Sequence, residues 1–239
     1  MRSRRAAFLA LLALISSEPA SAQPDPNSPI CPPNPNWSTY PRMRFTVQAV
    51  PGSYPVLLAE GQIDDEMLPR LEEALRTFRG NEIWLRSSGG NAGVANRAGF
   101  LIHGATLSTR IPAGWACFSA CAWMFMGGVV RSVDPGGLLI VQRLGDNPDP
   151  AAVRRQAAPG GDGMARTIEN VAQESARRAT EENNFLMAMG ISRQLLTDII
   201  YRQTGPGEAG RRCLTVEEMH RYNVVNDVYG GPRQAKQAP

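Results

Sequence analysis

Two segments of the chain carry the residue types and spacing best suited to covalent chemistry. In Cys117-Phe118-Ser119-Ala120-Cys121, a serine follows a predicted strand and precedes an apolar, uncharged run that predicts a buried helix. A hydroxyl at that bend would project near a helix N-terminus, where main-chain N–H groups favour negative charge. The second segment, Ser87-Ser88-Gly89-Gly90, is a turn that follows another predicted strand. Together the segments have the layout of a nucleophile beside an oxyanion hole.

A base for this serine is not evident in the sequence. The chain has 2 histidines. We interpret His103 as a capping or surface residue at the end of a predicted helix, and His220 as a surface residue on a later helix. Neither lies where a base for Ser119 is expected, so the pattern predicts a hydrolase-like site and at the same time argues against ordinary hydrolysis.

The N-terminal segment has the features of a secretory signal. A basic start is followed by a short apolar run over residues 6–15 and by the small-residue signal Ala20-Ser21-Ala22. The apolar run is shorter than the roughly 20 residues that a membrane-spanning helix needs. We therefore expect residues 1–22 to be removed as a signal peptide, and an exported protein that is periplasmic or secreted and has no membrane span in its mature form.

Charge and residue types exclude several partners. Removal of the signal takes away three arginines and one glutamate, which lowers the formal net charge from +3 to +1. This balance gives no electrostatic reason to expect nucleic acid as a partner. Two distant histidines without metal-ligand spacing argue against a metal site, and no motif indicates a cofactor.

The 4 cysteines of an exported protein make disulfides plausible. Four cysteines allow three connectivities, and the sequence does not choose between them. We favour Cys117–Cys121, whose Cα atoms would be close if the pair flanks the start of a helix, together with Cys31–Cys213. The alternative for Cys117 and Cys121 is two small buried residues flanking Ser119.

Periodicity divides the chain into alternating strands and helices, which predicts an α/β fold with a largely parallel sheet. Residues 23–43 form a Pro/Asn-rich arm, residues 44–229 one domain, and residues 230–239 a disordered tail. The expected strands are 44–50, 56–60, 82–86, 107–111, 129–133, 138–142 and 224–228, together with the strand that leads into Ser119 through residues 115–117. The first expected helix is capped by Asp64 or Asp65. The further expected helices cover 91–103, 120–126, 164–189, 192–201 and 217–222. A loop is expected over 145–163.

The chain resembles the superfamily of the Clp protease proteolytic subunit and the crotonases, and is most similar to an exported, poorly characterised bacterial branch of it. The resemblance covers roughly residues 44–229 and rests on segments that occur in this order: GQIDDEMLPRLEEAL, NEIWLRSSGGNAG, CFSACAWMFMGG and LTVEEMHRYNVVNDV. It implies a ClpP-like spiral of stacked ββα units with a long outlying helix. Residues 164–189 would be that helix, and a candidate element for homo-oligomer formation.

The resemblance also assigns roles to residues of the site. It places Ser119 at the nucleophile and the N–H groups of Gly89 and Ala120 at the oxyanion hole. Counting from Pro135, it places Gln142 where the family has its histidine, and a shift of one residue would place Val141 there instead. It places residues 210–212 (Gly-Arg-Arg) where the family has its acid. A glutamine amide cannot accept the serine proton near neutral pH.

Three functions follow as hypotheses. The first is a degenerate enzyme that binds a peptide or an acyl group in an open groove. The second is an active, noncanonical serine peptidase or esterase, which needs another base near Ser119; the loop carboxylates Asp146 and Glu208 are candidates. The third is a structural or assembly protein whose cleft is filled, for example by Trp115 or Phe118.

Overall fold

The computed structural model describes residues 31, 32, 34–142, 161–201 and 210–227. The predicted signal peptide, the first part of the predicted arm, most of the loop over 145–163 and the predicted tail lie outside the described residues. Asp146 and Glu208 lie outside them as well. Among the described residues, no helix is both long and apolar enough to cross a membrane.

The larger of two sheets has five strands in the order β1-β2-β3-β4-β6. Strand β1 runs antiparallel to β2, and every other neighbouring pair is parallel. The predicted α/β fold with a largely parallel sheet is therefore confirmed. The strands are β1 (Arg44–Gln48), β2 (Val56–Glu60), β3 (Glu82–Arg86), β4 (Ser108–Ile111) and β6 (Arg131–Val133).

The smaller sheet has the order β5-β7-β8, formed by β5 (Ala116–Phe118), β7 (Leu138–Gln142) and β8 (Arg211–Cys213). Strands β5 and β7 are parallel, and β8 is antiparallel to β7. A bridge between Ser87 and Cys117 joins the end of β3 to β5. This bridge brings the Gly-Gly turn after β3 next to the bend after β5, so the two segments that suggested chemistry lie together.

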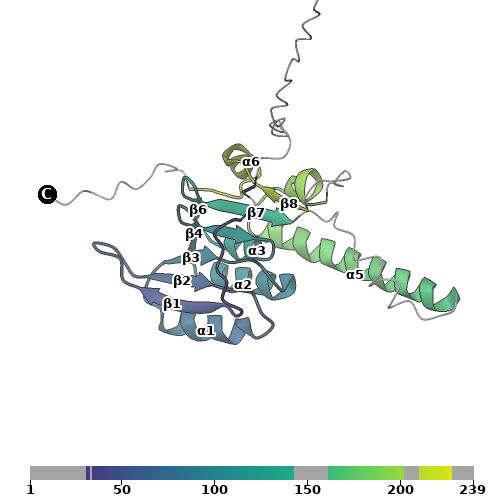
Figure 1. Ribbon diagram of the computed structural model, residues 1–239, viewed down its shortest axis with the longest axis horizontal. Coiled ribbons are helices and arrows are strands. Elements are labelled where there is room, and N and C mark those ends of the chain that lie inside the picture. The colour runs from purple at the N-terminus through teal and green to yellow at the C-terminus, as the bar shows by residue number, and fades with distance from the viewer. Residues whose placement is uncertain (1–30, 33, 143–160, 202–209, 228–239) are drawn as a thin grey trace, which may run out of the picture.

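Helices cover the sheets and complete the core (Figure 1). Helix α3 (Cys121–Met126) is buried along its whole length, as its apolar sequence predicts. It packs against α2 (Ala92–Gly104). The remaining helices are α1 (Met67–Thr77), α5 (Gly161–Ala188), the π-helical turn η1 (Leu196–Ile200) and α6 (Val216–Arg221). Helix α5 projects away from the two sheets, while its C-terminal end joins the core through Phe185 and Leu186.

Local capping chemistry sets where several helices begin. The Asn91 side chain accepts the N–H of Val94 and starts α2, and Thr215 forms a capping box with Glu218 at the start of α6. The predicted cap of α1 differs. Its N-cap position is Glu66, and Asp64 instead accepts the N–H groups of Met43 and Glu66.

One predicted strand is wrong, and one strand was not predicted. Residues 224–227 are not a strand, because the carbonyls of Asn223 and Val224 accept hydrogen bonds from the buried side chain of Arg131. Burial of the Arg131 side chain also lowers its pKa to about 10, because removal from water disfavours the charged guanidinium. Strand β8 was missed because it is three residues long and begins with two arginines, which no apolar pattern indicates.

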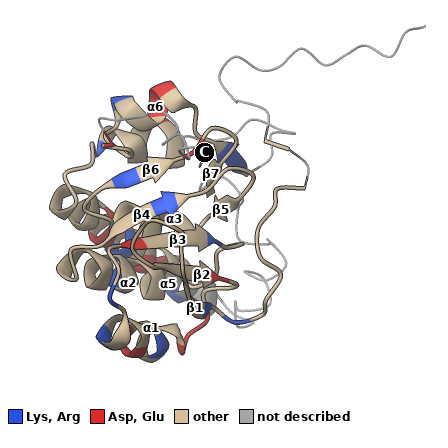
Figure 2. Cartoon of the chain, turned by 90° about the vertical axis from the view of Figure 1, so that its left-hand side faces the viewer, with Lys and Arg blue, Asp and Glu red and all other residues tan. Residues whose placement is uncertain are grey.

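Both predicted disulfides are present. Cys31–Cys213 ties the N-terminal arm to β8, and Cys117–Cys121 spans the bend that holds Ser119. Acidic and basic residues are scattered over the elements (Figure 2), in keeping with the small formal charge.

Candidate active site

Ser119 lies at the bend between β5 and α3 with a main-chain φ of 54°. This left-handed conformation is costly for a residue with a side chain, and such strain is concentrated at functional sites. The bend is fixed on both sides: the Ser119 N–H donates to Ile140 O at 2.9 Å, and the Ser119 carbonyl accepts the N–H of Ala122 at 3.0 Å. The Cys117–Cys121 disulfide closes the same bend. These hydrogen bonds and the disulfide therefore hold the main chain of Ser119 in a strained conformation.

Gln142 is the hydrogen-bond partner of that hydroxyl. The Ser119 Oγ donates to Gln142 Oε1 at 2.9 Å, from the last residue of β7. The structure thus brings together the two residues that the sequence assigned to the nucleophile and to the missing histidine. Because an amide oxygen has no useful basicity near neutral pH, Gln142 can orient the hydroxyl but cannot remove its proton.

The position assigned to the acid lies beside Gln142. In the antiparallel pairing of β7 and β8, Arg211 is directly opposite Gln142, and opposite residues share one face of a sheet. The next residue, Arg212, is buried and pairs with Glu218 of α6. The chain therefore has cationic residues where a triad would need a carboxylate.

The Gly-Gly turn lies against the serine. A Cβ atom added to Gly89, whose φ is 89°, would lie 2.7 Å from Phe118 O and 3.0 Å from Ser119 Cβ. The close approach and the positive φ both require glycine at this position.

The expected oxyanion donor at Gly89 is already engaged. Its N–H donates to Ser87 Oγ at 3.1 Å, and Ser87 Oγ in turn donates to Gly61 O at 2.6 Å. Among the described residues, no hydrogen-bond partner is found for the N–H groups of Gly90 and Ala120. Gly90 and Ala120 both line the pocket at Ser119. In this conformation Gly90 and Ala120 are therefore the candidate main-chain donors at the pocket, and the N–H of the expected Gly89 has a partner within the protein.

The pocket at Ser119 has a volume of about 190 Å³, enough for several water-sized groups. Residues of the bend and of β7 form one side of it. Helix α5 contributes two charged residues that sequence reasoning missed, Arg178 and Glu182. The lining also includes Ala92, Ala122, Trp123, Met126, Val141 and Ile200.

Glu182 is a buried acid in this pocket, with 8% of its surface exposed. The hydroxyl of Tyr201, directly after η1, donates to Glu182 Oε2 at 2.6 Å. Burial raises the pKa of the Glu182 carboxyl, while the hydrogen bond from Tyr201 opposes the rise. A buried carboxyl with a raised pKa in a pocket is a candidate functional group.

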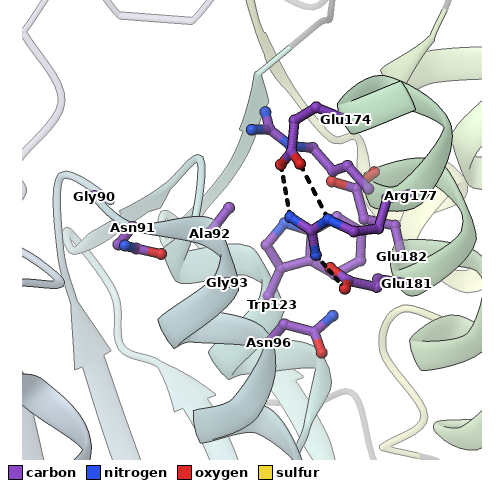
Figure 3. A pocket seen from close by; sticks show the side chains of 11 residues that line it. Gly90, Asn91, Ala92, Gly93, Asn96, Trp123, Glu174, Arg177, Glu181 and Glu182 are labelled. Carbon is purple, nitrogen blue, oxygen red and sulfur yellow. Dashed lines mark hydrogen bonds and ion pairs between the residues drawn. The ribbon is translucent and has the colours of Figure 1, made fainter. Parts of the chain in front are cut away.

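A polar groove of about 470 Å³ adjoins this pocket between the start of α2 and helix α5 (Figure 3). Gly90, Ala92, Trp123, Arg178 and Glu182 line both spaces. In the groove, Arg177 lies between two glutamates of α5 and forms ion pairs with each of them, Glu174 and Glu181.

Other predicted candidates lie elsewhere. His103 is in the last turn of α2, and its Nδ1 lies 3.2 Å from Gly127 O. His220 is on α6. Neither histidine lines the pocket at Ser119, and the described residues contain no cluster of side chains suited to a metal ion.

The two aromatic residues that would fill the cleft pack elsewhere. Phe118 stacks on Trp37 of the arm, with ring centroids 5.5 Å apart. Trp115 contacts Trp84 edge-on and lies beneath Arg86. The pocket at Ser119 is therefore not closed by either side chain.

No protein-family model and no curated protein matches the chain. Among solved structures, the chain is similar to a point mutant of ClpP1 from Listeria monocytogenes, with 18% identity over 72% of this chain and 88% of that chain and a TM-score of 0.49. It is also similar to a point mutant of the membrane-bound stomatin-specific protease 1510-N, with 14% identity over 72% of this chain and 75% of that chain and a TM-score of 0.43.

Proposed function

We propose that the pocket at Ser119 binds the carbonyl group of a peptide or an acyl ligand, and that the protein is a degenerate relative of serine peptidases. The observation that carries the proposal is the hydrogen bond from Ser119 Oγ to Gln142 Oε1 at 2.9 Å. A group that cannot accept a proton occupies the place of the base, so Ser119 stays a neutral hydroxyl.

Carbonyl binding is supported by the groups that remain. Gly90 and Ala120 line the pocket, and their N–H groups lack partners among the described residues. Paired main-chain donors of this kind suit a carbonyl oxygen, and they keep that ability when a catalytic base is lost.

The two alternative functions have less support. An active hydrolase that uses Ser119 as its nucleophile needs a base within hydrogen-bond reach of the hydroxyl, and the described side chain found there is Gln142. A purely structural protein would have a filled cleft, whereas the pocket has a volume of about 190 Å³.

The proposal is tested by titrating the ¹⁵N-labelled protein with N-acetyl-trialanine methylamide, which carries an acetyl group and peptide carbonyls in one neutral molecule. We expect the amide proton resonances of Gly90 and Ala120 to move downfield and to saturate, because both N–H groups gain an acceptor. If these two resonances stay in place up to the solubility limit of the peptide, the proposal is wrong.

Two leucine variants control for binding elsewhere. Ala92 lines the pocket at the start of α2, so Ala92→Leu should abolish the shifts by filling the space. Ala176 is exposed on α5 and does not line the pocket, so Ala176→Leu should leave them unchanged.

We further propose that the protein is exported and that α5 associates with a second copy. The two disulfides support export, because such bonds persist in oxidising compartments. The exposed side chains of Ile168 and Val171, three residues apart on α5, support self-association. If the protein is exported and processed, mass spectrometry should find Gln23 at the mature N-terminus. If α5 associates with a second copy, sedimentation should show an oligomer that Ile168→Asp dissociates.

A further inference from the structure

Within the described part of the chain, Glu182 is the one acid that both lines the pocket at Ser119 and is buried. It belongs to α5, whereas Gln142 of the same pocket belongs to β7, and the Tyr201 hydroxyl donates to its Oε2 at 2.6 Å. The carboxylate has further acceptor positions, because each of its two oxygens can accept more than one hydrogen bond.

We propose that Glu182 is the general base of a second hydrolytic chemistry in this pocket, in which water attacks a bound carbonyl directly and Ser119 is not the nucleophile. This inference rests on the proposed binding of a carbonyl by Gly90 and Ala120. It adds an activity to that site, and its substrate class is small activated acyl esters that fit a pocket of about 190 Å³.

The reaction balances with water as the only co-reactant. A water oxygen forms a bond to the carbonyl carbon while Glu182 accepts one of the water protons, and the carbonyl electron pair moves onto the oxygen held by the N–H groups of Gly90 and Ala120. When this pair returns, the bond from carbon to the leaving oxygen breaks. The leaving group departs as an alkoxide or phenoxide, the carboxylic acid product remains, and Glu182 releases its proton to solvent.

The charged neighbours of Glu182 determine when it can act as a base. Tyr201 donates a hydrogen bond to it, and on its own helix Arg178 favours the carboxylate while Glu181 opposes it. Burial outweighs these contributions and raises the pKa of Glu182. Because the carboxylate is the active form, we expect the rate to rise with pH and to level off above the ordinary glutamate pKa of about 4.3.

The test measures hydrolysis of p-nitrophenyl acetate by the mature protein, after subtraction of the buffer rate. We expect Glu182→Gln to lower the rate by about 100-fold or more, since a general base contributes at least that much. Glu217→Gln is the matched control. It removes an exposed carboxylate of α6 that pairs with Arg221, and it should keep the wild-type rate.

Tyr201→Phe tests whether Glu182 acts as a base or only supports the pocket. Tyr201 is a positioning residue, and loss of its hydrogen bond disfavours the carboxylate. The inflection of the pH–rate profile should therefore move to higher pH, whereas loss of a merely structural contact would lower the rate without moving the inflection.

The outcomes are separable from those of the proposed function. A wild-type rate equal to the buffer rate, or a Glu182→Gln variant that is folded by circular dichroism and keeps the wild-type rate, overturns this inference. Neither result affects the binding proposal, which is decided by the Gly90 and Ala120 resonances. If those resonances do not respond while hydrolysis depends on Glu182, the binding proposal fails and the base assignment stands.

Discussion

Ser119 combines a strained main chain with a hydroxyl that donates its hydrogen bond to the side-chain amide oxygen of Gln142. Its φ of 54° places the side chain at the bend before α3, and the Gly-Gly turn packs against it closely enough to exclude any side chain at Gly89. Strain of this kind persists where the surrounding structure fixes it. The geometry of a nucleophile is therefore kept at a residue whose partner, Gln142, does not support that chemistry.

The strain itself gives a prediction. Ser119→Gly and Ser119→Ala both remove the hydroxyl, but only glycine accepts a positive φ at little cost. We expect Ser119→Gly to have a free energy of unfolding about 1 kcal/mol above that of Ser119→Ala, measured by urea denaturation. Equal stability of the two variants, or the reverse order, would show that the bend is not strained.

At this scale the sequence predicted that Ser119 and Gln142 lie together. The resemblance assigned Ser119 and Gln142 to the site, the latter by the count from Pro135, and the structure brings these two residues into contact. The donor at Gly89 could not be judged from sequence, since its engagement depends on the hydroxyl of Ser87, which is fully buried.

At the scale of elements, helix α5 both projects from the domain and lines the pocket at Ser119. Its C-terminal part is packed into the core, and Glu182 on that part closes one side of the pocket. This role could not be predicted from the sequence, because Glu182 lies in a helix of mixed charge with acidic and basic neighbours throughout. Only the packing of α5 against α3, through Phe185 and Trp123, shows which of its glutamates is buried.

The raised pKa of Glu182 predicts how stability depends on pH. The folded protein holds this proton to a higher pH than the unfolded chain does, so wild-type stability falls as pH rises from about 4.3 to the raised pKa. Glu182→Gln lacks this loss. The free energy of unfolding of wild type minus that of Glu182→Gln should therefore decrease over this range and then stay constant.

Urea denaturation of both proteins in a series of buffers measures this difference. A difference that increases with pH over the same range would mean that Glu182 is stabilised as a carboxylate, contrary to the burial of its side chain.

For the whole molecule, two disulfides act over very different lengths of chain. Cys31–Cys213 joins residues 182 apart, and Cys117–Cys121 joins residues 4 apart. Both pairings were favoured from the sequence, but their consequences needed the structure. The long bond fixes the arm beside β8, and the short bond fixes the bend at Ser119.

The chain-entropy account of disulfides predicts unequal losses. Replacing Cys31 and Cys213 by serine should lower the free energy of unfolding by about 5 kcal/mol, and replacing Cys117 and Cys121 by serine should lower it by about 2 kcal/mol. Urea unfolding followed by tryptophan fluorescence measures both losses. A larger loss for the short bond would contradict this ranking.

The overall fold was predictable because strands and helices alternate clearly, and β2, β3 and β7 match their predicted ranges. The C-terminal region was not. There the buried Arg131 takes the carbonyls that a strand over 224–228 would have used, and Arg211–Cys213 pairs with β7 despite its charge. Such long-range pairings leave no periodic signal in the sequence.

The central claim is that the site lacks an activated serine because Gln142 stands where a base is needed. Its most direct test is fluorophosphonate labelling of wild type, Ser119→Ala, Gln142→His and Gln142→His with Arg211→Asp. Histidine at 142 has a reach similar to that of glutamine, and Asp at 211 would lie opposite it on the same face of the sheet.

We expect no labelling of wild type, labelling at Ser119 in Gln142→His, and faster labelling in the double variant. Wild-type labelling that disappears in Ser119→Ala would contradict the claim, because it would mean that another group already activates the serine.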